Sequence, residues 1–146
     1  MEDEDKTEVV RTLKEQYSKG QRDFKRIDLQ NADLSGADLE GINLVGANLL
    51  NANLQGTNLK GANLSGADLC LADLYGADLT SAILISADLD HADLQTAILY
   101  KANLRLANIN HADFRGADLN SADLTDTQNL EDADFSGAEL SGCIYE

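Results

Sequence analysis

The stretch ADLSGADLEGINLVGANLLNANLQGTNLKGANLSGADL, from Ala32 to Leu69, repeats a unit of five residues: alanine, then aspartate or asparagine, then leucine, then two variable residues. With the central apolar residue as position i, the phase runs unbroken from Phe24 to Leu124 through 21 units. Position i−2 is alanine in 17 units, and position i−1 is aspartate in 12 and asparagine in 7. So long a match identifies an internal repeat, which decides the fold before any helix or strand is assigned.

A period of five residues fits neither an α-helix nor a long β-strand. Positions i−2 and i are two residues apart, so in an extended segment their side chains point the same way and i−1 points away. Position i+2 is glycine or asparagine in ten units, and these residues accept the positive φ of a turn. The chain therefore turns once per unit, and the sequence predicts an all-β solenoid filled by alanine and leucine.

The A-(D/N)-L-x-x tandem between Asp23 and Leu140 resembles the pentapeptide repeat family, and its regular units are similar to the plain class frequent in cyanobacteria. The resemblance implies a right-handed quadrilateral β-helix with four units, or about 20 residues, in each coil. For this chain length it implies about six coils, with each leucine stacked on the leucine of the next coil. Members of the plain class mostly have undefined roles.

Two parts of the chain are expected. Residues 1–22 do not repeat, and we expect an acidic tail followed by a capping helix over 6–19, with Asp5 and Glu8 as a capping box and Gly20 just after the helix. The apolar face of that helix is expected to cover the first coil. The residues on this face are Val9, Val10, Leu13 and Tyr17.

Residues 23–146 are expected to form the repeat solenoid. The phase slips by one residue after Leu124, and we expect a bulged corner or short loop at 126–129. The apolar centres resume at Leu130, Phe135 and Leu140. The last residues, Cys143, Ile144 and Tyr145, are expected to plug the C-terminal end, with Cys143 buried and inert.

The composition excludes several classes of function. A net charge of −15 argues against direct binding of nucleic acid or of an anionic membrane, because both interactions use lysine and arginine. An acidic residue, an amide or a lysine interrupts every apolar run, so no membrane span is expected. The two distant cysteines suggest reduced thiols, and we expect a cytoplasmic protein unless a presequence has been removed.

No catalytic chemistry is expected. The chain carries no HExxH, P-loop, GxSxG or CxxC motif, and its carboxylates belong to the repeat rather than to a cleft. His91 and His111 are 20 residues apart and are expected to stack, but two imidazoles make a weak metal site. We therefore expect no enzyme activity, no cofactor and no metal.

Apolar residues at outward positions are the exception to the repeat, and they suggest a docking surface or a homodimer contact on two adjoining faces. Residues 83–85 are the expected centre, since Ile83 replaces the usual aspartate or asparagine. Cys70 is also outward, and Tyr75, Ile98 and Tyr100 belong to the other faces. The candidate interaction residues are Val45, Leu50, Leu71, Ile83, Ile85 and Leu106.

Two functions follow from these observations. The first is a non-catalytic structural or protein-interaction module with an unknown protein partner, either monomeric or weakly dimeric. The second is an acidic rod that imitates DNA and acts on DNA gyrase or another DNA-binding protein, as some members of the family do. Charge and shape favour the second function. The absence of a projecting loop and of a long segment after Gly142 disfavours it.

Overall fold

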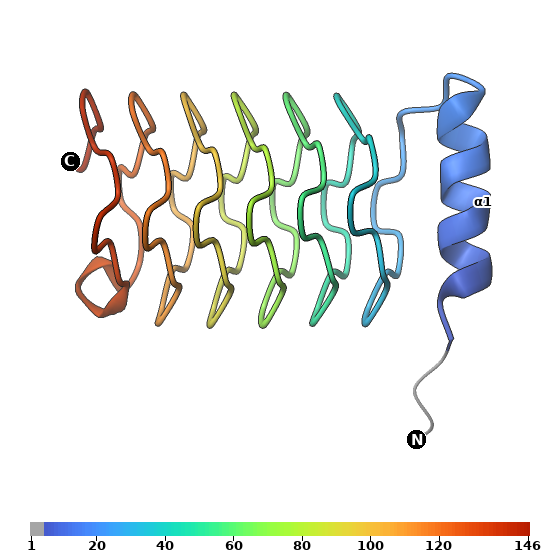
Figure 1. Ribbon diagram of the computed structural model, residues 1–146, viewed down its shortest axis with the longest axis horizontal. Coiled ribbons are helices and arrows are strands. Elements are labelled where there is room, and N and C mark those ends of the chain that lie inside the picture. Colours follow the sequence, from blue (N-terminus) through green and yellow to red (C-terminus); the bar gives the residue numbers. More distant parts are fainter. Residues whose placement is uncertain (1–4) are drawn as a thin grey trace.

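The structure is a computed structural model that describes residues 5–146. Within this range it contains the α-helix α1 (Thr7–Ser18), the 3-10 helix η1 (Leu130–Asp132) and a long series of isolated β-bridges (Figure 1). The coils follow one another along a rod, and α1 lies across the end where the rod begins. Residues 1–4, the acidic tail expected from the sequence, lie outside the described residues.

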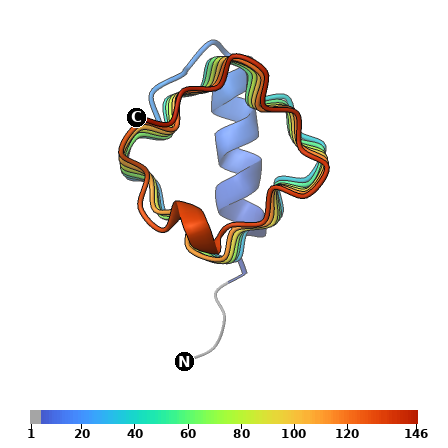
Figure 2. The same cartoon turned by 90° about the vertical axis from the view of Figure 1, so that its left-hand side faces the viewer.

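A register of 20 residues holds the coils together. Parallel bridges run from Asp23↔Asn43 to Asn108↔Gln128, each joining the i−1 residues of neighbouring coils. Next to each bridge the backbone amide at position i donates to the next coil, as Leu34 N does to Asn53 O over 2.8 Å. Viewed along the rod, the coils superpose in an outline with four corners (Figure 2).

Leucine and alanine fill the interior, as the repeat predicts. From Leu29 to Leu124 every residue at position i is at most 1% exposed, and the alanines at i−2 are equally covered from Ala47 to Ala122. Thr57 stands in for one of these alanines and is fully buried, and its hydroxyl donates to Leu34 O over 2.9 Å. Each corner then turns through a residue with positive φ at i+2.

The hydroxyl of Thr127 occupies the same inward position without a partner. It is buried and makes no hydrogen bond to any described residue. A buried hydroxyl without a partner costs about 1–3 kcal/mol. We expect Thr127→Ala to raise the free energy of unfolding by about 1 kcal/mol in urea titrations, and Thr57→Ala, which removes a satisfied hydroxyl, to leave it equal or lower. Equal gains from both substitutions would contradict this account.

The aspartates and asparagines at i−1 stabilise the corners. Their side-chain oxygens accept from the backbone amide two residues later, as Asp33 Oδ1 does from Ser35 N over 3.0 Å. Asparagine amides also link neighbouring rungs, and Asn58 Nδ2 donates to Asp38 Oδ1 over 3.0 Å. The outward column is therefore a row of turn-stabilising groups, which explains its aspartate and asparagine content.

Helix α1 packs on the first coil through the expected face. Val10 and Leu13 are buried in the same cluster as the inner leucines, with Val9 and Tyr17 packed beside them. The phenol of Tyr17 donates to Glu40 O over 2.7 Å. Gly20 follows the helix with a φ of 99°, as expected for a residue that ends a helix.

The capping box expected at the start of α1 does not form, because Lys6 rather than Asp5 is the N-cap residue and no side chain caps it. Asp5 Oδ1 accepts from Thr7 N over 2.9 Å and also from the Thr7 hydroxyl. The Glu8 carboxylate does not complete the box, because it pairs with Arg11 one turn further along the helix. Arginine three residues later offers the stronger, charge-assisted partner.

The register changes later than the sequence suggests. Asp126 still turns a corner with a φ of 57°, and Gln128 still bridges Asn108. The extra residue falls among 129–133, where Asn129 has a φ of 63° and η1 follows, and the next bridge joins Asp113 to Asp134. Asn129 takes the place due to a leucine, and it lies on the surface because a polar amide is costly to bury.

The C-terminal plug expected from Ile144 and Tyr145 does not form. Ile144 is 52% exposed and Tyr145 is 44% exposed, whereas Cys143 is half-buried. Ile144 bridges Asp123, so it occupies the outward i−1 position of the unit rather than an inward one. The inner residues of this last coil, among them Leu130 and Leu140, are half-buried.

Candidate functional site

Two adjoining sides of the solenoid carry the candidate residues. We name the first the Ile83 face, which consists of the units centred on Leu44, Leu64, Leu84, Leu104 and Leu124. We name the next side the Asp88 face, which consists of the units centred on Leu29, Leu49, Leu69, Leu89 and Ile109. The corner residues Leu106 and Leu71 stand at the two edges of the Asp88 face, two coils apart in the register.

The six candidates differ in exposure. Leu71 is 57% exposed and Leu106 is 44% exposed, while Val45, Leu50, Ile83 and Ile85 are half-buried. The half-buried residues adjoin the inner leucine at i−1 or i+1, between the side chains of the neighbouring rungs. Ile83, for example, bridges Asn63 on one side and Asn103 on the other.

Leu71 and Leu106 project because they occupy corners. Their φ values are 59° and 61°, in the left-handed region. Fourteen residues other than glycine have positive φ in the described range, and these two leucines are the only apolar ones. Such a conformation costs a residue with a Cβ atom roughly 1–2 kcal/mol.

The middle of the Asp88 face holds a cluster of three potential metal ligands. A carboxylate oxygen of Asp68, the sulfur of Cys70 and a carboxylate oxygen of Asp88 all lie within 4.8 Å of one another. All three residues are half-buried. Burial, reinforced by the two carboxylates, raises the pKa of the Cys70 thiol far above its ordinary value, so the thiol is protonated at neutral pH.

The two histidines lie next to each other in consecutive coils, as the repeat predicts, with their rings tilted by 51°. The ring centroids of His91 and His111 are 4.9 Å apart on the corner beside this cluster. His91 Nδ1 lies 2.9 Å from Asp90 Oδ1, and Asn110 Nδ2 donates to the same oxygen over 2.8 Å. Chiefly because of the Asn110 amide, the pKa of Asp90 lies below its ordinary value. The Asp90 carboxylate therefore already has partners, in the His91 ring and the Asn110 amide.

A shallow groove of about 390 Å³ adjoins Leu106 on the Asp88 face. Its walls come from Ser86, Ala87, Asp88, Asn108 and Gln128. The groove combines carboxylate and amide groups with the exposed leucine at its rim. This arrangement suits a partner side chain with an apolar body and a donor group at its end.

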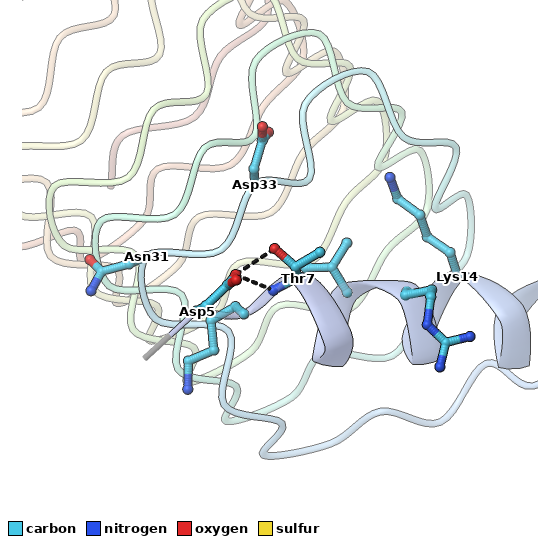
Figure 3. Close-up of a pocket in the computed structure, with 8 residues that line it drawn as sticks. Asp5, Thr7, Lys14, Asn31 and Asp33 are labelled. Atoms are coloured by element: carbon cyan, nitrogen blue, oxygen red, sulfur yellow. Dashed lines mark hydrogen bonds between the residues drawn. The ribbon is translucent and has the colours of Figure 1, made fainter. Parts of the chain in front are cut away.

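Hollows also flank helix α1, where a single helix crosses a wider coil. One of about 460 Å³ lies between the N-terminus of α1 and the first coil, with Asp5, Thr7 and Lys14 on one wall and Asn31 and Asp33 on the other (Figure 3). The hydroxyl and amide of Ser35, with a smaller contribution from Lys14, lower the pKa of Asp33. The mixed charges of this hollow match no single class of ligand.

Sequence reasoning missed the cluster of Asp68, Cys70 and Asp88. The signal was present, since Cys70 follows Asp68 by two residues and Asp88 follows Asp68 by the 20 residues of one coil. Exposure also differs among the outward residues in a way that the sequence pattern does not show. Tyr75 is 47% exposed, Ile98 39% and Tyr100 38%, so these three project more than the half-buried candidates. None of the helices in the described range has the length and apolar character of a membrane span.

Comparison with known proteins gives a consistent result. The family model for pentapeptide repeats matches in eight copies, at residues 23–61, 47–84, 57–95, 87–126 and 102–144. A search of curated protein sequences gives no match.

Among solved structures, a pentapeptide repeat protein from Nostoc PCC 7120 is 38% identical, with a TM-score of 0.63, over 89% of this chain and 93% of that one. A pentapeptide repeat protein from the thylakoid lumen of Arabidopsis thaliana is also 38% identical, with a TM-score of 0.66, over 68% and 69% of the two chains. QnrB1, a plasmid-mediated fluoroquinolone resistance protein, is 18% identical with a TM-score of 0.39, which is too remote to bear on function.

Proposed function

The chain belongs to the pentapeptide repeat family, and on that premise we propose that it is a non-catalytic module that docks a protein partner through the Asp88 face and the adjoining Ile83 face. Members of the family with this fold present long rows of side chains on a rigid rod. Rigid surfaces bind with a small loss of conformational freedom, which favours recognition of a preformed partner.

The observation that carries this proposal is the placement of Leu71 and Leu106. Both residues hold a left-handed conformation that glycine adopts without strain, and both expose a large apolar side chain. The equivalent corners elsewhere in the repeat are mostly glycine or small polar residues. Strain together with exposure is the pattern expected of side chains that contact a partner.

Glycine substitution separates docking from stability. We expect Leu71→Gly combined with Leu106→Gly to keep or raise the free energy of unfolding, by up to about 1 kcal/mol per site, because left-handed strain is removed. We expect the same double variant to recover at least about tenfold less partner protein in quantitative pull-downs from native cell extract. Exposed apolar anchors carry much of the binding energy.

Tyr75→Ser is the matched control, because it removes an exposed apolar side chain from a different face. Ile85→Asp tests the Ile83 face in the same assay. Retention of the same proteins by the double variant would contradict docking at the Asp88 face. Equal losses from Tyr75→Ser would show nonspecific adhesion instead.

Two architectural points belong to the same proposal. We take the solenoid to comprise about six coils, from the 20-residue register of the bridges. We take α1 to be the cap of the first coil, because Val10 and Leu13 are buried in the cluster that contains the inner leucines. An uncovered coil would present unpaired backbone groups and apolar side chains to other molecules.

The second candidate function is DNA imitation towards a DNA-binding protein such as gyrase. The observation in its favour is the column Asp73, Asp93, Asp113 and Asp134, in which carboxylates occupy consecutive rungs of a rod with a net charge of −15. A supercoiling assay distinguishes the two functions: protection or inhibition of gyrase at micromolar protein would favour imitation of DNA.

We also propose a cytoplasmic location and a monomer or weak homodimer. The free thiols of Cys70 and Cys143 support a reducing compartment. The relative from Arabidopsis thaliana comes from the thylakoid lumen, so cell fractionation is the appropriate test of location. Light scattering of the double variant and of the unmodified protein tests self-association through the same surface.

A further inference from the structure

The cluster of Asp68, Cys70 and Asp88 brings two kinds of metal ligand together. Asp68 and Asp88 bridge each other on neighbouring rungs, and Cys70 lies two residues beyond Asp68 on the same face. The thiol sulfur is within 4.8 Å of an oxygen of each carboxylate. Within residues 5–146, these are the three histidine, cysteine, aspartate or glutamate side chains whose potential ligand atoms lie this close together.

Side-chain amides of the neighbouring rungs separate the carboxylates of this column, except between Asp68 and Asp88. Below this pair, Asn48 Nδ2 donates to Asp28, and above it, Asn108 Nδ2 donates to Asp88. No side-chain amide lies between Asp68 and Asp88 in this column, because each is a carboxylate and each bridges the other. Neither carboxylate has an ion pair with a described residue, and the group between them is the Cys70 thiol.

We propose that Asp68, Cys70 and Asp88 form a binding site for a thiophilic divalent cation of the zinc class. One sulfur and two carboxylate oxygens suit Zn²⁺, which takes sulfur and oxygen ligands in tetrahedral sites and keeps water in a free position. On binding, the sulfur–metal bond replaces the sulfur–hydrogen bond, and the proton passes to solvent. The cation also neutralises the two adjacent carboxylates, which no side-chain amide separates.

The backbone requires no rearrangement to hold this site. Asp68 Oδ1 accepts from Cys70 N over 3.0 Å, and Asp88 Oδ1 accepts from Asp90 N over 3.1 Å. These contacts fix the first torsions of both carboxylates on a rigid rung. Ligands held by such hydrogen bonds bind metals better than mobile ones, because less ordering is needed on binding.

Conservative substitutions test the site without disturbing the fold. Asparagine already occupies i−1 in seven units and serine occupies i+1 at Ser35 and Ser65, so Asp68→Asn, Asp88→Asn and Cys70→Ser all use residues that the repeat accepts. Zn²⁺ affinity of the reduced full-length protein is measured by calorimetry. Cd²⁺ then reports sulfur ligation through its ultraviolet charge-transfer band.

We expect Cys70→Ser to abolish the cadmium–sulfur band, and Asp68→Asn and Asp88→Asn each to weaken Zn²⁺ binding about tenfold or more. Two variants should leave both readouts unchanged. Cys143→Ser removes the other thiol, and Asp73→Asn removes a carboxylate that bridges another carboxylate, Asp93, on the next face.

Three results would overturn the proposal. The first is no cadmium–sulfur band, or a band that disappears with Cys143→Ser. The second is a band that depends on Cys70 but is indifferent to both aspartates, which would indicate a solitary thiol. The third is Zn²⁺ binding that survives Cys70→Ser but is lost on replacing His91 and His111 with alanine, which would assign the metal to the histidine corner.

Discussion

Leu74→Ala is expected to lower the free energy of unfolding by about 2–5 kcal/mol. Leu74 is fully buried near the middle of the rod, in an inner column with Leu54 before it and Leu94 after it. Its backbone amide donates to Asp93 O over 2.7 Å, so the rung is fixed and cannot collapse onto the cavity left by the substitution. A cavity that stays open adds its own cost to the lost transfer free energy.

The effect should spread along the rod, because each coil contacts only its neighbours. In such a solenoid the stability is close to a sum of coil and interface contributions, and a central leucine contributes to two interfaces. Urea unfolding followed by circular dichroism measures the loss.

Leu71→Ala is the matched control for this prediction, since Leu71 lies three residues earlier in the same coil but is 57% exposed. We expect its free energy of unfolding to stay within about 0.5 kcal/mol of the unmodified protein. Equal costs for the two substitutions would mean that the interior is not close-packed, contrary to the burial of the inner leucines.

The repeat made most of the fold predictable from sequence. A five-residue unit fixes which residues point inward, and the structure buries the central residue of every unit from Leu29 to Leu124. The corner was predictable for the same reason, because glycine and asparagine at i+2 indicate positive φ, which the structure has at Gly36 and Asn51. The four-sided cross-section came from resemblance to a family rather than from the residues themselves.

The rest depended on local competition that a repeat pattern does not report. Glu8 could reach back to the helix start or forward to Arg11, and the charged partner prevails. The extra residue after Leu124 could be accommodated at several corners. It is accommodated at Asn129, because an amide side chain is tolerated on the surface. Such choices depend on small differences between nearby partners.

The candidate site was predictable in part. The 20-residue register correctly places His91 next to His111, and the same register applied to Asp68 would have placed Asp88 beside it, with Cys70 two residues from Asp68 on the same face. Exposure was harder to predict, since i+1 and i+2 are both outward in the pattern. Only the corner geometry explains why Leu106 projects while Ile85 is half-buried.

Leu13→Asp is expected to detach α1 from the first coil and to lower the free energy of unfolding by about 2–5 kcal/mol. Leu13 is 1% exposed, and burying a carboxylate there without a partner would cost more than releasing the helix. The contacts that depend on the docked helix would be lost as well, including the Tyr17 hydrogen bond to Glu40 and the ion pair between Lys6 and Asp28.

Detachment would expose the first coil, and we expect the variant to associate at concentrations where the unmodified protein does not. The inner leucines of that coil and its unpaired backbone groups form an edge that other chains can extend. Urea unfolding gives the stability and light scattering gives the mass.

The control for Leu13→Asp is Thr12→Asp, which adds the same charge one residue earlier, on an exposed position of the same helix. It should leave both measurements nearly unchanged, because a surface carboxylate on α1 breaks none of the contacts with the first coil. If the two variants behaved alike, α1 would not be the cap of the solenoid, and the first coil would have to be stable when open to solvent.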